Sequence, residues 1–168
     1  MIRSTLHLLL LALLFLAACG KEDDPATSAG PQATGALVSI DGCKQFFSAE
    51  GGDKSKSCLS WNFDASAKVL ELVHENAGFN CCPKAINASI TIEGQIITIA
   101  ESEIGPACDC NCLFDLHMRL DNVTADRYTI RIIEPYRNKE DEELLVPVDL
   151  RIQATGSYCV PRFHYPWS

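Results

Sequence analysis

The chain has little positive charge, and after residue 18 it has no long apolar run. Its 168 residues include 14 Lys and Arg against 22 Asp and Glu, for a formal net charge of -8. Phosphate backbones and anionic headgroups are repelled by so acidic a surface, which argues against nucleic acid as a partner. The longest unbroken apolar segment spans residues 8–18. It is too short for a transmembrane helix, which needs roughly 20 apolar residues.

Sequence signatures of common catalytic sites are also missing. The chain contains no G-x-S-x-G, no H-E-x-x-H, no phosphate-binding loop and no dinucleotide-binding pattern, and it has only 4 histidines. We therefore predict a protein that is not an enzyme and that carries no cofactor. His74 and His164 are isolated in the sequence. Isolation favours ordinary hydrogen bonding over metal ligation for both of them.

The amino terminus predicts export and lipidation. Arg3 precedes the apolar run, and the small residues that suit a signal peptidase lie just before Cys19, in the order Leu16-Ala17-Ala18-Cys19. This order resembles the lipobox of bacterial lipoproteins. The resemblance implies that residues 1–18 are a signal peptide and that Cys19 becomes the acylated first residue. Two or more acyl chains hold a protein durably at a membrane.

Residues 19–36 are expected to comprise the acylated cysteine and a flexible linker, because residues 20–36 are rich in Gly, Pro, Ser, Thr and Ala and lack periodic apolar residues. Within this segment, Lys21-Glu22-Asp23-Asp24 resembles the surface-export signal of some Gram-negative lipoproteins. We therefore expect a protein anchored to the outer membrane by lipid, either on the periplasmic side or on the cell surface.

Residues 37–168 predict one all-β domain. Apolar residues recur with period two in short runs that Gly, Asp and Asn interrupt, and no amphipathic helix is evident. About seven such strands fit a single antiparallel β-sandwich, for which we expect an immunoglobulin-like arrangement. The stretch from Leu120 to Ile132 resembles the corner of such sandwiches, which implies that the Tyr128 hydroxyl bonds back to the backbone of the preceding turn.

Several strands can be placed by their alternation. Residues 59–63 and 70–72 predict one hairpin around a turn at 64–67. Residues 86–100 predict another, with Glu93-Gly94 as a two-residue turn that sets Ile90 opposite Ile97 and Ala88 opposite Ile99. A long strand is expected over 108–120 with its even positions inward, and another over 146–152, where Pro147 indicates a sheet edge.

Cysteine is the unusual component of the composition. Besides Cys19 there are eight cysteines, an even number that predicts four disulfides in an exported protein: Cys43, Cys58, Cys81, Cys82, Cys108, Cys110, Cys112 and Cys159. Neighbours in sequence are poorly placed to pair with each other. We hypothesise a local bridge between Cys43 and Cys58, with the other six cysteines pairing among themselves across the sheets.

Metal handling is the alternative interpretation of these cysteines. Thiolates would suit copper or zinc, and the candidate ligands are Cys81, Cys82, Cys108, Cys110 and Cys112. Spacing favours disulfides, because cysteines at every second position of a strand lie along a line and do not surround one ion. His117 would lie on the opposite face of that strand, and Met118 would lie too far along it to help.

The carboxyl terminus gathers three aromatic residues, Phe163, Tyr165 and Trp167, next to Arg162. We expect these rings to pack over one end of the sandwich, with exposure for a sugar or peptide ligand as the alternative. The Asn80-Cys81-Cys82 segment, the hairpin of 86–99 and the CDCNCLFDL run resemble a set of uncharacterised cysteine-rich bacterial lipoproteins. We therefore expect a lipid-anchored binding or structural module of the envelope or cell surface, with a glycan or an envelope protein as possible ligand.

Overall fold

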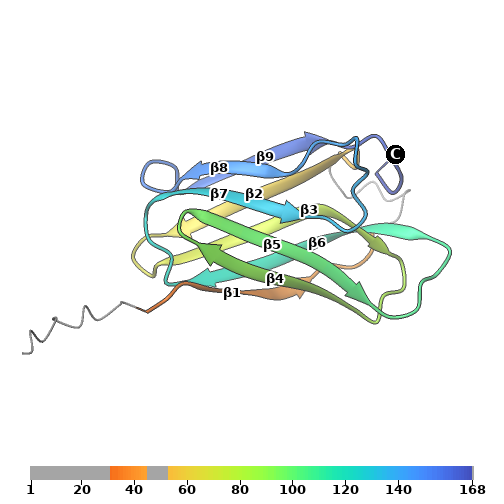
Figure 1. Ribbon diagram of the computed structural model, residues 1–168, viewed down its shortest axis with the longest axis horizontal. Coiled ribbons are helices and arrows are strands. Elements are labelled where there is room, and N and C mark those ends of the chain that lie inside the picture. Colours follow the sequence, from red (N-terminus) through yellow and green to blue (C-terminus); the bar gives the residue numbers. More distant parts are fainter. Residues whose placement is uncertain (1–30, 45–52, 168) are drawn as a thin grey trace, which may run out of the picture. The chain divides into compact units, whose positions relative to one another are not determined.

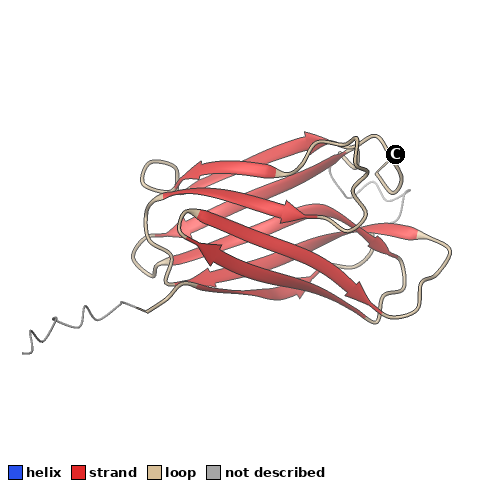
Figure 2. Cartoon of the chain, in the orientation of Figure 1, coloured by secondary structure: helices blue, strands red, loops and turns tan. Residues whose placement is uncertain are grey.

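The computed structural model describes residues 31–44 and 53–167, which form nine strands and no helix. None of these residues belongs to a helix that could cross a membrane. The strands make two sheets, shown in Figures 1 and 2. The five-stranded sheet has the order β1 (Thr34–Ile40), β6 (Asn111–Asp121), β3 (Val69–Asn80), β2 (Lys56–Asp64), β9 (Thr155–Pro161). The four-stranded sheet has the order β4 (Ala85–Glu93), β5 (Ile96–Ile104), β7 (Arg127–Ile133), β8 (Leu145–Asp149).

The core lies between the two sheets, as the period-two pattern predicts. Alternate residues of most strands point inward and are buried, and the largest of them form one continuous cluster. The first predicted hairpin is confirmed, because β2 pairs with β3 so that Trp61 lies opposite Leu72 and Phe63 opposite Leu70. The all-β sandwich class is therefore confirmed. Its immunoglobulin-like connectivity stays a prediction, although the Tyr128 hydroxyl does donate to the Thr124 carbonyl oxygen at 3.3 Å.

One neighbouring pair of strands departs from the antiparallel expectation. β5 and β7 run parallel, with Ile97 opposite Ile130 and Ile99 opposite Ile132. Between them in sequence lies β6, which belongs to the other sheet. Because the chain crosses to that sheet and returns, β7 arrives beside β5 in the same direction. A pattern of alternation specifies which face is buried but not the direction of a strand.

The second predicted hairpin forms with a different register. Its turn is Gly94-Gln95, so that Ile90 lies opposite Ile99 and Ile92 opposite Ile97. Gly94 has a φ of 59°, the conformation that favours glycine at the first central position of a two-residue turn. The expected turn at Glu93-Gly94 would have put glycine second. The true register differs by two residues, so the same side chains still face inward.

Two predicted strands begin or end elsewhere. β6 begins at Asn111, so Cys108 and Cys110 lie exposed in the connection before it and only Cys112 of the three points into the core. β8 ends at Asp149, and Ile152 beyond it is 84% exposed. The position of Pro147 in an edge strand is confirmed, since β8 closes its sheet. β1 begins at Thr34, three residues before the expected start of the domain.

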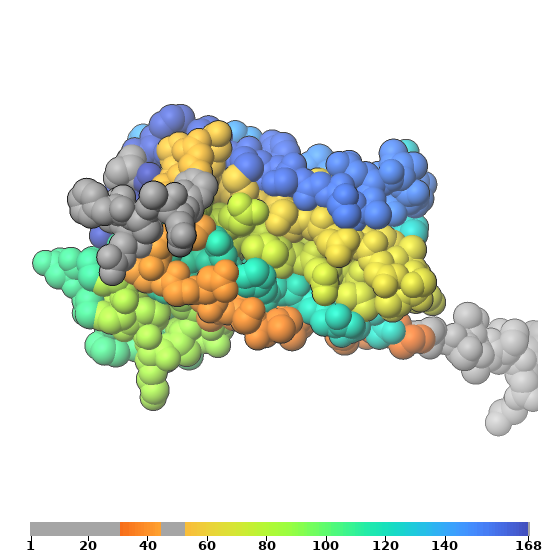
Figure 3. All heavy atoms as spheres, turned by 180° about the vertical axis from the view of Figure 1, so that it is seen from behind, coloured from red at the N-terminus to blue at the C-terminus, as the bar shows by residue number. Residues whose placement is uncertain are grey.

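The sandwich has two distinct ends. At one end, which we call the Thr34 end, β1 begins opposite the last residue of β6, Asp121. At the other end, β3 finishes where β6 begins, with Asn80 opposite Asn111. We call this the clamped end, defined by residues 81–84, 104–111 and 162–167. The connection from β5 to β6 projects from it, as the teal atoms on the left of Figure 3 show.

Candidate functional site

Four disulfides join the eight cysteines, as the sequence predicts. They are Cys43–Cys112, Cys58–Cys159, Cys81–Cys110 and Cys82–Cys108. The hypothesised bridge between Cys43 and Cys58 is wrong. Cys58 lies directly opposite Cys159 in the ladder between β2 and β9. Cys43 follows β1 and bonds to Cys112, the second residue of β6. The expectation that the other six cysteines pair among themselves holds for only four of them, in the bridges Cys81–Cys110 and Cys82–Cys108. It is wrong for Cys112 and Cys159, because these two join Cys43 and Cys58.

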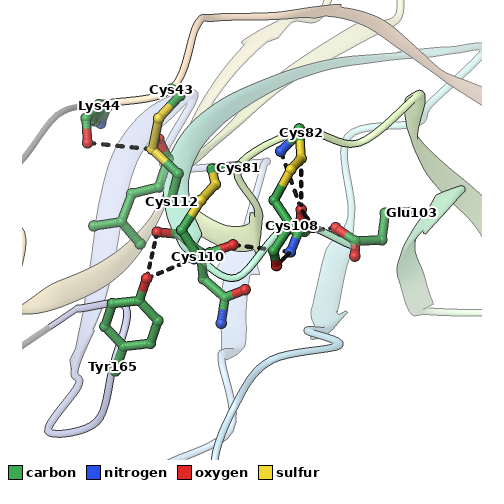
Figure 4. Close-up of a disulfide and its surroundings, with 12 residues drawn as sticks. Cys43, Lys44, Cys81, Cys82, Glu103, Cys108, Cys110, Cys112 and Tyr165 are labelled. Carbon is green, nitrogen blue, oxygen red and sulfur yellow. Dashed lines mark hydrogen bonds between the residues drawn. A yellow bond between two sulfur atoms is a disulfide. The ribbon is translucent and has the colours of Figure 1, made fainter. Parts of the chain in front are cut away.

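Two of the disulfides hold the clamped end together. Cys81–Cys110 and Cys82–Cys108 join the connection after β3 to the connection before β6, as Figure 4 shows. Asn80 supports both connections, because its side-chain amide donates to the carbonyl oxygens of Cys108 and Cys110 at 2.7 and 2.9 Å. Its oxygen accepts from the backbone N–H groups of Cys82 and Cys108. The clamped end is therefore a set of connections with little freedom to move.

The carboxyl-terminal tail packs over the same end. The expected packing of its aromatic rings is found for Tyr165 and Trp167 but not for Phe163. The Tyr165 hydroxyl accepts from the Asn111 backbone N–H at 2.6 Å and donates to the Asn111 carbonyl oxygen at 3.0 Å (Figure 4). The buried Trp167 indole donates to the Asn76 carbonyl oxygen at 2.7 Å. Trp167 also lies so close to Gly78 that a Cβ there would come within 2.8 Å of the ring. Phe163, by contrast, is 69% exposed.

The exposed surface of the clamped end is mostly apolar. Ile104 is 57% exposed and Tyr165 is 50% exposed, and Pro106 and Ala107 beside them are exposed as well. Connections held by a rigid scaffold commonly carry recognition. A surface that combines apolar side chains, two aromatic rings and a few charges fits a macromolecular ligand better than a small ion.

The cysteines of the metal alternative all lie in disulfides. Each of Cys81, Cys82, Cys108, Cys110 and Cys112 has a sulfur partner, and a disulfide sulfur lacks the thiolate charge that binds copper or zinc. Among residues 31–44 and 53–167, no group of three His, Cys, Asp or Glu side chains could hold a metal ion. The predicted lipidation site, Cys19, lies outside the described residues.

A buried polar cluster lies beneath the clamped end, between the sheets. His74 Nε2 is 2.8 Å from Ser57 Oγ, and His74 Nδ1 is 2.6 Å from a carboxylate oxygen of Glu101. Ser57 Oγ lies 2.9 Å from Glu134, which is paired with Arg162. The side chains of His74, Glu101, Glu134 and Arg162 are at most 1% exposed. Ser57 lies in β2, His74 in β3 and Glu101 in β5. Glu134 directly follows β7, and Arg162 is the first residue of the tail after β9.

The hydrogen bonds of this cluster determine where its protons lie. Because the Ser57 hydroxyl donates to Glu134, its oxygen accepts from His74 Nε2–H. The opposite ring nitrogen faces the Glu101 carboxyl group at 2.6 Å, so one proton lies between His74 Nδ1 and Glu101. Burial raises the pKa of Glu101 as well. The His74–Glu101 pair and the Glu134–Arg162 pair are each neutral overall, which is the condition under which buried ionisable groups are tolerated.

The ionisation of His74 follows from its neighbours. Burial alone favours the neutral ring, but the carboxylates of Glu101 and then Glu134 outweigh burial and the repulsion of Arg162, and so raise the pKa of His74. A histidine whose pKa is raised by folding stabilises the protein fully below the pKa of the unfolded chain, about 6.5. This stabilisation is lost as the pH rises through the pKa of the folded state.

We therefore expect the free energy of unfolding to fall as the pH rises from 6 to 9, with a slope of at most about 1.4 kcal/mol per pH unit for the one proton. The measurement is urea unfolding at several pH values. His74→Gln should remove this slope, whereas His117→Gln, on the surface beside Asp41, should keep it. The carboxylates whose pKa is lowered, such as Asp53 and Asp64, titrate below this range. An unchanged slope in His74→Gln would contradict the assignment.

The same cluster has the connectivity of a serine, histidine and carboxylate triad, but its arrangement opposes catalysis. Ser57 is fully buried, and its hydroxyl proton is directed to Glu134 instead of His74. A nucleophilic serine needs its proton accepted by a neutral imidazole and needs access to a substrate. The cluster therefore fixes β2, β3, β5 and the tail to one another. The sequence gives His74 no visible partner, because the residues around it lie 17 to 88 positions away.

Comparison with models of protein families, with curated protein sequences and with solved structures finds no significant match for this chain.

Proposed function

We propose that this protein is a lipid-anchored, non-catalytic binding module of the bacterial cell envelope, held at Cys19 and recognising a glycan or an envelope protein through its clamped end. Support for the anchor comes from the order Leu16-Ala17-Ala18-Cys19. Support for a stable extracytoplasmic domain comes from the four disulfides, which form and persist in oxidising compartments.

The position of the clamped end is the observation that carries the proposal. The chain leads from Cys19 into the domain at the Thr34 end, where Thr34 lies opposite Asp121. The clamped end begins at the other terminus of β6, where Asn111 lies opposite Asn80. Strand residues advance about 3.3 Å each, so β6 separates the two ends by roughly 33 Å. An anchor at the Thr34 end would leave the clamped end accessible to a partner.

Lipidation is tested by replacing the cysteine that would carry it. In cells that make bacterial lipoproteins, the unaltered chain should partition into the detergent phase of a cloud-point extraction and incorporate labelled palmitate. Cys19→Ser should move to the aqueous phase and lose the label. Ser28→Ala, a change of similar size in the segment after Cys19, should behave as the unaltered chain does. A Cys19→Ser protein that stays in the detergent phase with its label would show that the anchor is elsewhere.

Recognition at the clamped end is tested with a photo-crosslinking amino acid in intact cells. Placed at the exposed position of Ala107, it should capture a glycan or an envelope protein. Placed at Ala65, in the turn between β2 and β3 at the Thr34 end, it should capture much less. Equal capture from both positions, or none from position 107, would mean that the clamped end is not the recognition surface.

A further inference from the structure

The sandwich has four edge strands, and three of them are protected from pairing with another chain. β1 carries a register irregularity between Leu37 and Ser39. β1 also packs beside β4, with Gly35 against Ile90, which covers that side of both sheets. β8 has Pro147, which lacks a backbone N–H, at its centre. Bulges, prolines and covered edges are the usual means by which proteins prevent strands from adding to a sheet.

The fourth edge, β9, has none of these protections. Its seven residues, Thr155–Pro161, pair with β2 in an unbroken register and include no charged side chain. The only proline is its last residue. Five of the seven residues are exposed, and the strand lies along one long side of the molecule in Figures 1 and 3. The disulfide between Cys58 and Cys159 fastens β9 to β2, so the edge is held in place.

The hydrogen bonds at the two ends of this ladder show which groups of β9 point outward. Phe63 N donates to Ala154 O at 2.7 Å, and Arg162 N donates to Ser55 O at 2.8 Å. Antiparallel pairs alternate between those that exchange backbone hydrogen bonds and those that do not. Both ends give the same alternation, in which every second residue of β9 bonds to β2. The residues whose N–H and C=O groups face away from β2 are therefore Thr155, Ser157 and Cys159.

We propose that β9 is a dimerisation edge, which pairs with β9 of a second copy in an antiparallel ladder centred on Ser157. In this register Ser157 meets Ser157 of the second copy, and Thr155 meets Cys159 on either side. All the outward N–H and C=O groups of these residues then find partners. The ladder ends before Pro161, whose missing N–H would interrupt it. The two five-stranded sheets become one continuous sheet across a two-fold axis, which is the commonest symmetry of protein dimers.

The side chains of β9 complement each other in the same register. Gly156 lies opposite Tyr158 of the second copy, so a residue without a side chain faces an aromatic ring that is 38% exposed in the single chain. An aromatic side chain across from a strand glycine is a favourable pair. Charge favours this edge as well. Each chain carries a formal charge of -8, and like charges directly opposite destabilise a ladder, but β9 brings none together.

The size of the contact sets the expected strength. A ladder of five residues buries less than the ~1,200 Å² of a standard stable interface. We therefore expect a reversible dimer with a dissociation constant on the order of 10 μM to 1 mM. The fraction of dimer should rise with protein concentration. A membrane anchor would raise the local concentration, but the pairing itself does not require the proposed function.

Sedimentation equilibrium on the oxidised full-length chain tests this inference, with Cys19→Ser in every sample to remove association through lipid. The Cys19→Ser chain should dimerise reversibly. Adding Ser157→Lys, which places two like charges on the axis, should weaken the dimer at least tenfold. Adding Ser157→Pro should do the same, because it removes an outward N–H that the ladder with β2 does not use. Ser89→Lys, an equal charge change at an exposed position of β4, should leave the dimer unchanged.

A Cys19→Ser chain that stays monomeric up to millimolar concentration would overturn the proposal. So would a dimer that Ser157→Lys and Ser157→Pro leave intact while their unfolding curves match that of the parent chain. A loss of the dimer in the Ser157 variants but not in Ser89→Lys would support it. These results do not depend on whether Cys19 is acylated or on what the clamped end binds.

Discussion

Replacing Glu134 with alanine is expected to lower the free energy of unfolding by about 3 to 5 kcal/mol, because removal of one partner from a buried ion pair leaves the other charge unpaired. Glu134 is the only carboxylate within ion-pair distance of Arg162 among the described residues, and both side chains are at most 1% exposed. The Ser57 hydroxyl would also lose its acceptor. Urea unfolding at pH 6 measures the change. Glu143→Ala, an exposed carboxylate beside Arg131, should cost less than about 1 kcal/mol.

A double variant distinguishes the cost of an orphaned charge from the net contribution of the pair. Glu134→Leu with Arg162→Met removes both charges and keeps apolar volume, so it should recover much of the stability that Glu134→Ala loses. Recovery will be incomplete, because Ser57 and His74 keep their polar groups in the cluster. A double variant that is less stable than Glu134→Ala would mean that the charges themselves, and not their pairing, stabilise the clamped end.

The sequence predicts the features of this fold that arise from local periodicity. Alternating residues such as Trp61 and Leu72 specify which face of a strand is buried, and Pro147 marks an edge because its ring lacks a donor. The direction of a strand and the register of a pair of strands are harder to predict from the sequence. The parallel pair of β5 and β7 results from a crossing between sheets, and the register of the second hairpin depends on where Gly94 falls in its turn. Neither is encoded in alternation.

In the candidate site, too, some features follow from the sequence and others depend on the fold. That the eight cysteines form disulfides follows from their number and compartment, but which pairs form depends on distant segments that the fold brings together. Cys43 and Cys58 are close in sequence, yet Cys43 joins Cys112 and Cys58 joins Cys159. The cluster around His74 is a stronger case, because its partners come from separate strands and the tail. Single polar residues in apolar strands were the only sequence signal for it.

Removal of the disulfide between β2 and β9 is the second change with a large expected effect. Cys58→Ala with Cys159→Ala should lower the free energy of unfolding by about 4 kcal/mol, since a disulfide restricts the unfolded chain more when it closes a longer loop. This bridge spans 101 residues, the longest separation of the four. It is also the only disulfide that ties the carboxyl-terminal part of the described chain, including Arg162 and the tail, to the rest.

The matched control is Cys82→Ala with Cys108→Ala, which removes a bridge of 26 residues. Its neighbour Cys81–Cys110 already closes almost the same loop, so the loss should be at most about 2 kcal/mol. Urea unfolding without reductant gives both values, and peptide mapping verifies that the other three bridges of each variant are unchanged. Equal losses in the two variants would mean that local packing, and not the restriction of the unfolded chain, determines what each disulfide contributes. A larger loss for the β2–β9 bridge would support loop length as the main determinant of what each disulfide contributes.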